Sequence, residues 1–82
     1  MNYFIIYAWG DCPFCVSAKE LLEEKGEHHM MVYLDHDDIL LRYLKKLHKW
    51  DTVPLILLHD EAKGDTTLIG GYTDLIARLE GK

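Results

Sequence analysis

The hydrophobic pattern divides the N-terminal half of the chain into a strand, a helix and a second strand. Residues 3–8 are apolar at almost every position, which is typical of a central strand covered on both faces. Residues 13–25 have a helical period, with charged side chains on the outer face. The inward stripe of this predicted helix is Cys15, Ala18, Leu21 and Leu22. Gly26 is placed to terminate the helix, and residues 29–34 form the next predicted strand, parallel to the first.

A polar segment, Asp35-His36-Asp37-Asp38, precedes the second predicted helix, residues 38–49. Its acids could form a metal-binding loop, but an N-cap followed by first-turn acids is the commoner role of such a segment. Lysines gather in the last turns of this helix, where they complement the helix dipole. The side chains expected to face inward are Ile39, Leu40, Tyr43, Leu44 and Leu47.

The remaining residues predict a hairpin and a third helix. Residues 55–58 form a third strand, residues 60–65 a polar turn, and residues 66–69 a short antiparallel fourth strand. Thr73 is expected to cap the final helix. Its inward residues would be Leu75, Ile76 and Leu79. The predicted order is β-α-β-α-β-β-α: an α/β fold with a four-stranded mixed sheet flanked by three helices.

The length and net charge of the chain exclude some classes of function. A chain of 82 residues suits one domain, residues 1–82. The net charge of −5, with acids and bases both scattered, does not favour a nucleic-acid partner. No apolar run is long enough to cross a bilayer, so no membrane association is expected. The first residues lack the basic start of a signal peptide, so we expect a cytoplasmic location.

The candidate chemistry lies in Cys12-Pro13-Phe14-Cys15, between the first strand and the first helix. A thiol at a helix N-terminus is favoured as the thiolate, which is the nucleophile of disulfide exchange. The second cysteine, one turn later, is placed to attack the mixed disulfide. The alternatives are half of a zinc site and two chance core cysteines. No second cysteine or histidine pair supplies the other zinc ligands, and core cysteines have no reason to bracket Pro13 at a strand–helix junction. A cytosolic CxxC beside a β-α-β pattern therefore indicates a thioredoxin-like redox motif.

Three motifs together resemble those of the glutaredoxins, a family with the thioredoxin fold. They are Cys12-Pro13-Phe14-Cys15, Thr52-Val53-Pro54 and Gly70-Gly71-Tyr72-Thr73-Asp74. Their order and separation extend the resemblance over nearly the whole chain. Phe14 stands where the family usually has tyrosine. Taken alone, Gly70-Gly71 could also be a plain tight turn, which is the less favoured explanation.

The resemblance implies a role for each motif. Cys12 would be the nucleophile and Cys15 the resolving thiol, with Pro13 and Phe14 completing the catalytic motif. The glutathione site would comprise Thr52, Val53, Pro54, Gly71, Tyr72, Thr73 and Asp74. Within it, Pro54 would be cis, and the last four residues would hold the γ-glutamyl carboxylate. A glycine-led helix N-terminus is also a ready anion site on physical grounds alone.

Some positions depart from the family pattern. Trp9 and Asp11 stand where lysine and threonine are common, and Leu41 aligns with a glutamine or arginine that contacts the glycyl carboxylate of glutathione. These departures predict weaker stabilisation of the Cys12 thiolate and weaker binding of glutathione. Basic side chains that could substitute for the missing contacts are Arg42, Lys45, Lys46 and Lys49.

The resemblance implies a thiol–disulfide oxidoreductase that uses glutathione as co-substrate and binds no tight cofactor. Its clients would be disulfide-containing proteins, ribonucleotide reductase among them, and we expect a monomer. Five histidines are present, but none pair at a ligand spacing, so no metal site is expected. One alternative is a thioredoxin-like electron donor that does not rely on glutathione. Another is a [2Fe–2S] cluster carrier, which Pro13 opposes by resemblance.

Overall fold

A computed structural model describes residues 1–80 of the chain. The elements, in chain order, are β1 (Asn2–Ala8), α1 (Pro13–Glu24), β2 (His29–Tyr33), α2 (Asp38–His48), β3 (Leu55–Asp60), β4 (Asp65–Gly70) and α3 (Tyr72–Leu79). This is the predicted β-α-β-α-β-β-α order, so the predicted fold class is confirmed. The strands of the hairpin are longer than expected, because β3 and β4 pair as far as Asp60 and Asp65.

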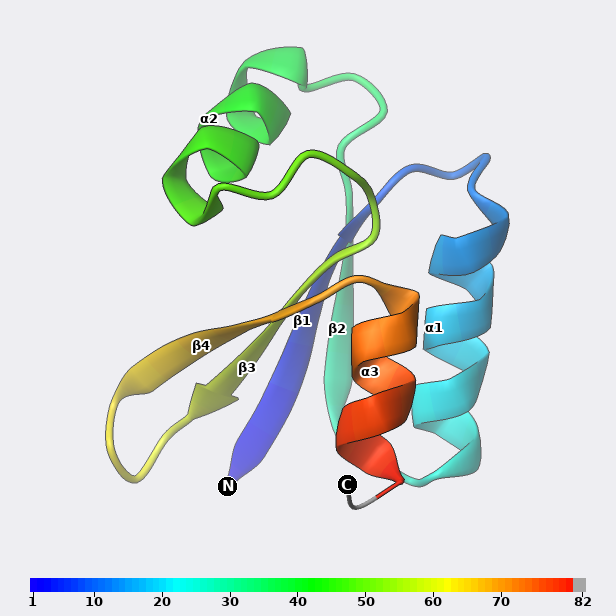
Figure 1. Cartoon of the computed structure of the whole chain (residues 1–82), viewed down its shortest axis with the longest axis vertical. Helices are drawn as coiled ribbons and strands as arrows, with labels where there is room; N and C mark the ends of the chain where they lie inside the picture. Colours follow the sequence, from blue (N-terminus) through cyan, green and yellow to red (C-terminus); the bar gives the residue numbers. More distant parts are fainter. Residues whose placement is uncertain (81–82) are drawn as a thin grey trace.

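The four strands form one mixed sheet in the order β2-β1-β3-β4. β1 pairs in parallel with β2 and antiparallel with β3, and β3 pairs antiparallel with β4. The motif that contains the two cysteines follows β1 at the upper end of the sheet in Figure 1. Because β1 and β3 are the central strands, a residue that follows β1 or precedes β3 lies at the middle of this edge.

Alternate residues of β1 enter two different cores. Phe4, Ile6 and Ala8 pack under α1 and α3, which lie side by side on one face of the sheet (Figure 1). Ile5 and Tyr7 point to the opposite face, toward α2. The period-two alternation of the strand therefore supplies both cores, as a strand covered on both faces requires.

The inward face predicted for the second helix is largely wrong. α2 buries Leu41 and Leu44, whereas Ile39, Tyr43 and Leu47 are exposed. α2 contains two apolar stripes at helical spacing, and it lies at the upper end of the sheet, where one side of the helix meets the core (Figure 1). The stripe that contains Leu41 and Leu44 packs against the sheet, and the stripe that contains Ile39, Tyr43 and Leu47 faces solvent.

The caps of the helices agree in part with the predictions. Gly26, after the C-cap of α1, has a φ of 69°, and Asp37 caps α2 through a hydrogen bond from Leu40 N to Asp37 Oδ1 of 3.0 Å. The predicted cap at Thr73 is wrong, since Gly71 is the N-cap of α3 and Thr73 lies in its first turn. Within residues 1–80, no helix has the length and apolar character needed to cross a membrane.

Candidate active site

The two cysteines lie at the N-terminus of α1 and form a disulfide. Cys12 is the N-cap, and its sulfur accepts a hydrogen bond of 3.2 Å from Cys15 N. Pro13 follows at the first helical position, where its missing N–H costs no hydrogen bond. Cys12 is 9% exposed and Cys15 only 1%. An incoming sulfur therefore reaches Cys12 more readily than Cys15.

The loop before the cysteines is fixed from β2. Both carboxylate oxygens of Asp35, which follows β2, accept hydrogen bonds of 3.0 Å from Gly10 N. A Cβ at Gly10 would lie 3.3 Å from an oxygen of Asp35, so a side chain there would crowd this contact. Asp35 thus positions the turn that leads into Cys12, a role the sequence pattern did not indicate.

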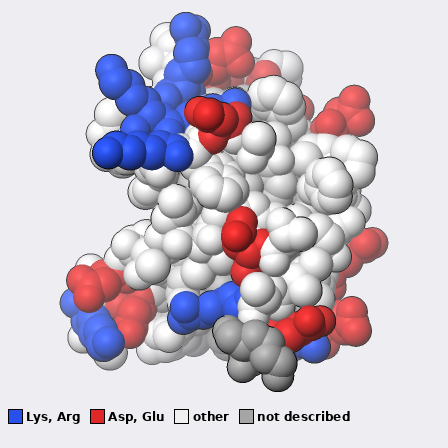
Figure 2. Space-filling model, viewed as in Figure 1, with Lys and Arg blue, Asp and Glu red and all other residues white. Residues whose placement is uncertain are grey.

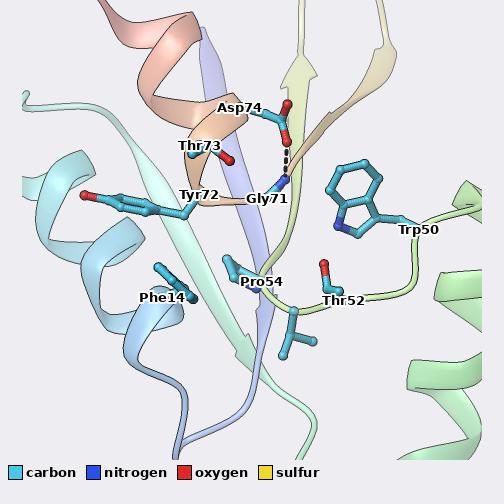
Figure 3. Close-up of a pocket in the computed structure, with 9 residues that line it drawn as sticks. Phe14, Trp50, Thr52, Pro54, Gly71, Tyr72, Thr73 and Asp74 are labelled. Atoms are coloured by element: carbon cyan, nitrogen blue, oxygen red, sulfur yellow. Dashed lines mark hydrogen bonds between the residues drawn. The ribbon is translucent and has the colours of Figure 1, made fainter.

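A cleft of about 390 Å³ lies beside the cysteine motif. Its walls come from α1, the segment before β3 and the start of α3, and the lining residues are Phe14, Trp50, Thr52, Val53, Pro54, Gly71, Tyr72, Thr73 and Asp74 (Figure 3). The structure therefore brings all seven residues assigned by resemblance to a glutathione site around one cavity. The Val53–Pro54 peptide bond is cis. Phe14 is 63% exposed and lies 6.0 Å, centroid to centroid, from the ring of Tyr72.

The start of α3 is organised by a side chain and two glycines. Asp74 Oδ2 accepts a hydrogen bond of 2.9 Å from Gly71 N (Figure 3). Gly70 has a φ of 120°, and a Cβ at this position would lie 2.5 Å from Asp74 Oδ2. Only glycine therefore fits here, and the explanation of Gly70-Gly71 as a plain tight turn is incomplete. The N–H groups of Tyr72 and Thr73, in the first turn of α3, have no partner within the helix.

Comparison with known proteins agrees with this geometry. The family model described as Glutaredoxin matches residues 4–62, which include both cysteines and the cis-proline segment. The chain belongs to the glutaredoxin family. Glutaredoxins are thiol–disulfide oxidoreductases, and the Cys12–Cys15 disulfide of this chain lies within the matched residues.

Individual glutaredoxins are moderately similar. A probable glutaredoxin of Synechocystis is 37% identical over 60 residues, which is 72% of this chain but only 55% of the Synechocystis protein. The glutaredoxin of Pseudomonas aeruginosa is 33% identical over 89% of this chain and 80% of its own length. The structure of a buckwheat glutaredoxin–glutathione complex superposes with a TM-score of 0.77 at 20% identity, covering 96% of this chain and 69% of the buckwheat chain. The last comparison supports the thioredoxin fold.

Trp50 lines the cleft although the sequence analysis did not select it. Its ring faces the glycines of the α3 N-terminus, and a Cβ at Gly71 would lie 3.5 Å from Trp50 Cζ2. Its Nε1 is buried and has no hydrogen-bond partner within residues 1–80. In the sequence, only its position two residues before Thr52-Val53-Pro54 could have suggested that Trp50 lies at the site. The residues around Trp50 give no indication of its contact with Gly71.

The departures from the glutaredoxin pattern change the charge of the site. Asp74 is the one charged residue among those that line the cleft. Leu41 is buried in the core under α2 and is no substitute for a polar contact. Trp9, in the place of a common lysine, lies under a cation instead, because Lys45 Nζ is 5.6 Å from its ring centroid. α2 thus supplies a positive charge next to the loop that precedes Cys12.

The histidines and acids do not assemble a metal site in the described part of the chain. No group of three or more His, Cys, Asp or Glu residues at ligand distances is present among residues 1–80. The acids around residue 37 have a structural role instead, because Asp37 caps α2 and Asp35 holds Gly10.

Proposed function

We propose that this glutaredoxin is a glutathione-dependent thiol–disulfide oxidoreductase that reduces protein disulfides and glutathione mixed disulfides. The main observation is the cleft of about 390 Å³ that joins the N-terminus of α3 and the cis-Pro54 segment beside the Cys12 motif. Its volume is within the range of small-ligand sites. A buckwheat glutaredoxin of the same fold has been solved in complex with glutathione, which is in keeping with glutathione as the ligand here.

The groups around the cleft suggest how glutathione would lie. Val53 precedes β3 and would offer its backbone to the cysteinyl residue in a short strand-like pairing. The N–H groups of Tyr72 and Thr73 would receive the γ-glutamyl carboxylate at the positive end of the helix dipole. The Asp74 carboxylate would repel a carboxylate of glutathione. In our proposal it therefore pairs with the α-ammonium group of the same glutamyl residue.

The chemistry would follow from the unequal exposure of the two thiols. The Cys12 thiolate attacks the glutathione-side sulfur of a glutathione mixed disulfide and forms a Cys12–glutathione disulfide, and the displaced client thiolate takes a proton from water. The N–H of Cys15 donates to the Cys12 sulfur and stabilises its negative charge. A glutathione thiolate then attacks the mixed disulfide, releasing oxidised glutathione and restoring Cys12. With a protein disulfide, Cys15 first displaces the client from Cys12, and two glutathiones reduce the resulting internal disulfide.

Turnover of a small mixed disulfide tests the proposal. Glutathione-dependent reduction of a cysteine–glutathione disulfide would be measured for wild type, Cys12→Ser and Cys15→Ser. We expect Cys12→Ser to lose all activity and Cys15→Ser to keep most of it, because the glutathione pathway needs one thiol. Wild-type protein that is inert with glutathione would refute the proposal.

A thioredoxin-like electron donor is the second candidate. The lack of lysine or arginine among the lining residues favours it, since the two carboxylates of glutathione would meet few cations. Reduction of the Cys12–Cys15 disulfide by a thioredoxin reductase, with no turnover by glutathione, would support this candidate instead.

We also propose a cytoplasmic location, where thiols are kept reduced and a CxxC is catalytic rather than structural. Disulfide-containing proteins would be the clients, and ribonucleotide reductase is the first to test. Its reduction in a reconstituted assay, absent with Cys12→Ser, is the expected result.

A further inference from the structure

The outer face of α2 exposes large apolar side chains that the active site does not explain. Ile39, Tyr43 and Leu47 are spaced by four residues and lie on one stripe of the helix. They are 79%, 60% and 57% exposed. Such a contiguous stripe of large apolar side chains on a small domain indicates a contact with another molecule.

Cations flank this stripe. Ile39, Arg42, Tyr43 and Lys46 together line a shallow hollow of about 320 Å³. Four of the nine Lys and Arg residues lie between residues 42 and 49, although the net charge of the chain is −5. None of the ion pairs among residues 1–80 involves these four side chains. Figure 2 shows Lys and Arg side chains gathered over α2, with a few acidic side chains directly beside them.

α2 is connected to the redox site through the side opposite to this stripe. Lys45 packs over Trp9, which lies three residues before Cys12. At its other end, α2 leads through Lys49 into Trp50 and Thr52, which line the cleft. A molecule that engages Cys12 is therefore close to α2.

We infer that the outer face of α2 is a docking surface for protein clients whose disulfide is flanked by acidic residues and a large apolar side chain. The inference rests on the thiol–disulfide exchange proposed above and adds the class of client. Charge complementarity with Arg42 and Lys46 selects the acidic segment, and the exposed Tyr43 takes the apolar side chain.

Two successive thiol–disulfide exchanges would reduce the client. The Cys12 thiolate attacks one sulfur of the client disulfide, forming a mixed disulfide and releasing the other client cysteine as a thiolate. The Cys15 thiolate then attacks the Cys12 sulfur and releases the second client thiolate. Both client thiolates take protons from water, and the protein retains the Cys12–Cys15 disulfide. Two electrons pass from the protein dithiol to the client.

The test uses two synthetic peptides of equal length, each with one internal disulfide. One has glutamates and a leucine beside the disulfide, and the other has lysines in place of the glutamates. Protein reduced beforehand with dithiothreitol and then desalted is mixed with each peptide, and the rate of peptide reduction is followed by chromatography. Because glutathione is absent, failure of the glutathione proposal would not affect this measurement.

Charge reversal on α2 is compared with a matched control. Arg42→Glu/Lys46→Glu should lower the rate with the acidic peptide by about three- to tenfold and raise it with the basic peptide. Lys25→Glu/Lys63→Glu changes the net charge equally at exposed sites outside α2 and should alter both rates little. A gain with the basic peptide cannot come from misfolding.

Several outcomes would overturn the inference. Equal rates of wild type with both peptides would show that no charge selection exists. If the two double variants changed the peptide reduction rates equally, the preference for the acidic peptide would come from the net charge of the protein and not from α2. Wild-type dimers in sedimentation that dissociate in Tyr43→Ser would identify a second copy as the occupant, and co-sedimentation with phosphatidylserine vesicles without peptide selectivity would identify a lipid surface.

Discussion

Asp11 places a carboxylate directly before the nucleophilic cysteine, in a position where other glutaredoxins often have threonine. A negative charge there opposes the Cys12 thiolate, which the helix dipole and the N–H of Cys15 favour. Asp11 is exposed, so water screens its effect. We expect Asp11→Asn to raise the rate of Cys12 alkylation by iodoacetamide at neutral pH by about two- to fivefold.

The control for this prediction is Asp65→Asn, which removes an exposed carboxylate from the β3–β4 hairpin. It should leave the alkylation rate unchanged. If Asp11→Asn has no effect either, the site tolerates the acid, and the thiolate would depend only on the helix N-terminus.

Gly70 determines whether Asp74 can hold the start of α3. Its φ of 120° strains any other residue, and a Cβ would displace the Asp74 carboxylate from Gly71 N. Gly70→Ala should lower the free energy of unfolding by about 1–3 kcal/mol. It should also raise the KM for glutathione, measured in the turnover assay, because Asp74 no longer faces the cleft in the same way.

Gly64→Ala separates backbone strain from damage to the site. Gly64 also has a positive φ, 70°, but a Cβ there would meet nothing within 4 Å. This variant should lose stability and keep the wild-type KM. An unchanged KM in Gly70→Ala would remove Asp74 from the proposed glutathione site.

At the scale of elements, α2 depends on its N-cap. Asp37 accepts the hydrogen bond from Leu40 N, and α2 buries few side chains that could compensate for its loss. Asp37→Ala should therefore destabilise the protein by about 1 kcal/mol, measured by urea unfolding. Asp37→Asn keeps an accepting oxygen and should retain most of the stability; equal losses would mean that charge, rather than the hydrogen bond, is what matters.

The elements themselves could be predicted because each has a local signal. These signals involve residues that are adjacent in sequence. β1 has apolar residues on both faces, Pro13 begins α1, and Gly26 follows the end of α1. The buried face of α2 could not be predicted, because it has two apolar stripes and only the position of the sheet selects between them. The Thr73 cap failed for a similar reason: Asp74 reaches back to Gly71, and the hydrogen bond makes glycine the N-cap.

At the scale of the whole molecule, the redox site lies where distant segments meet. The strand–helix junction at Cys12 was predictable from its immediate neighbours. The contact of Trp50 with Gly71 and the packing of Lys45 on Trp9 were not, because each joins segments that the sequence separates. Sequence motifs therefore predicted most residues that line the cleft. They did not predict that Trp50 packs against Gly71, or that Lys45 places a positive charge over Trp9.

The central strands and α2 bury unequal numbers of apolar side chains. β3 buries four successive side chains, Leu55 to Leu58, and β1 buries Phe4, Ile6 and Ala8. α2 buries only Leu41 and Leu44. Since the free energy of local opening follows buried apolar contacts, α2 amides should exchange with deuterium at a lower opening free energy than those of β1 and β3.

Native-state hydrogen exchange of the oxidised protein would measure this difference, with Leu44→Ala as the internal comparison. Leu44→Ala should accelerate exchange in α2 more than in β3, because it removes buried apolar surface from the weaker contact, that of α2. If α2 and β3 instead exchange with equal free energies, α2 opens only with the whole molecule. The stripe of Ile39, Tyr43 and Leu47 would then meet a client as a fixed surface, whereas separate opening of α2 would let that surface adjust its position relative to Cys12.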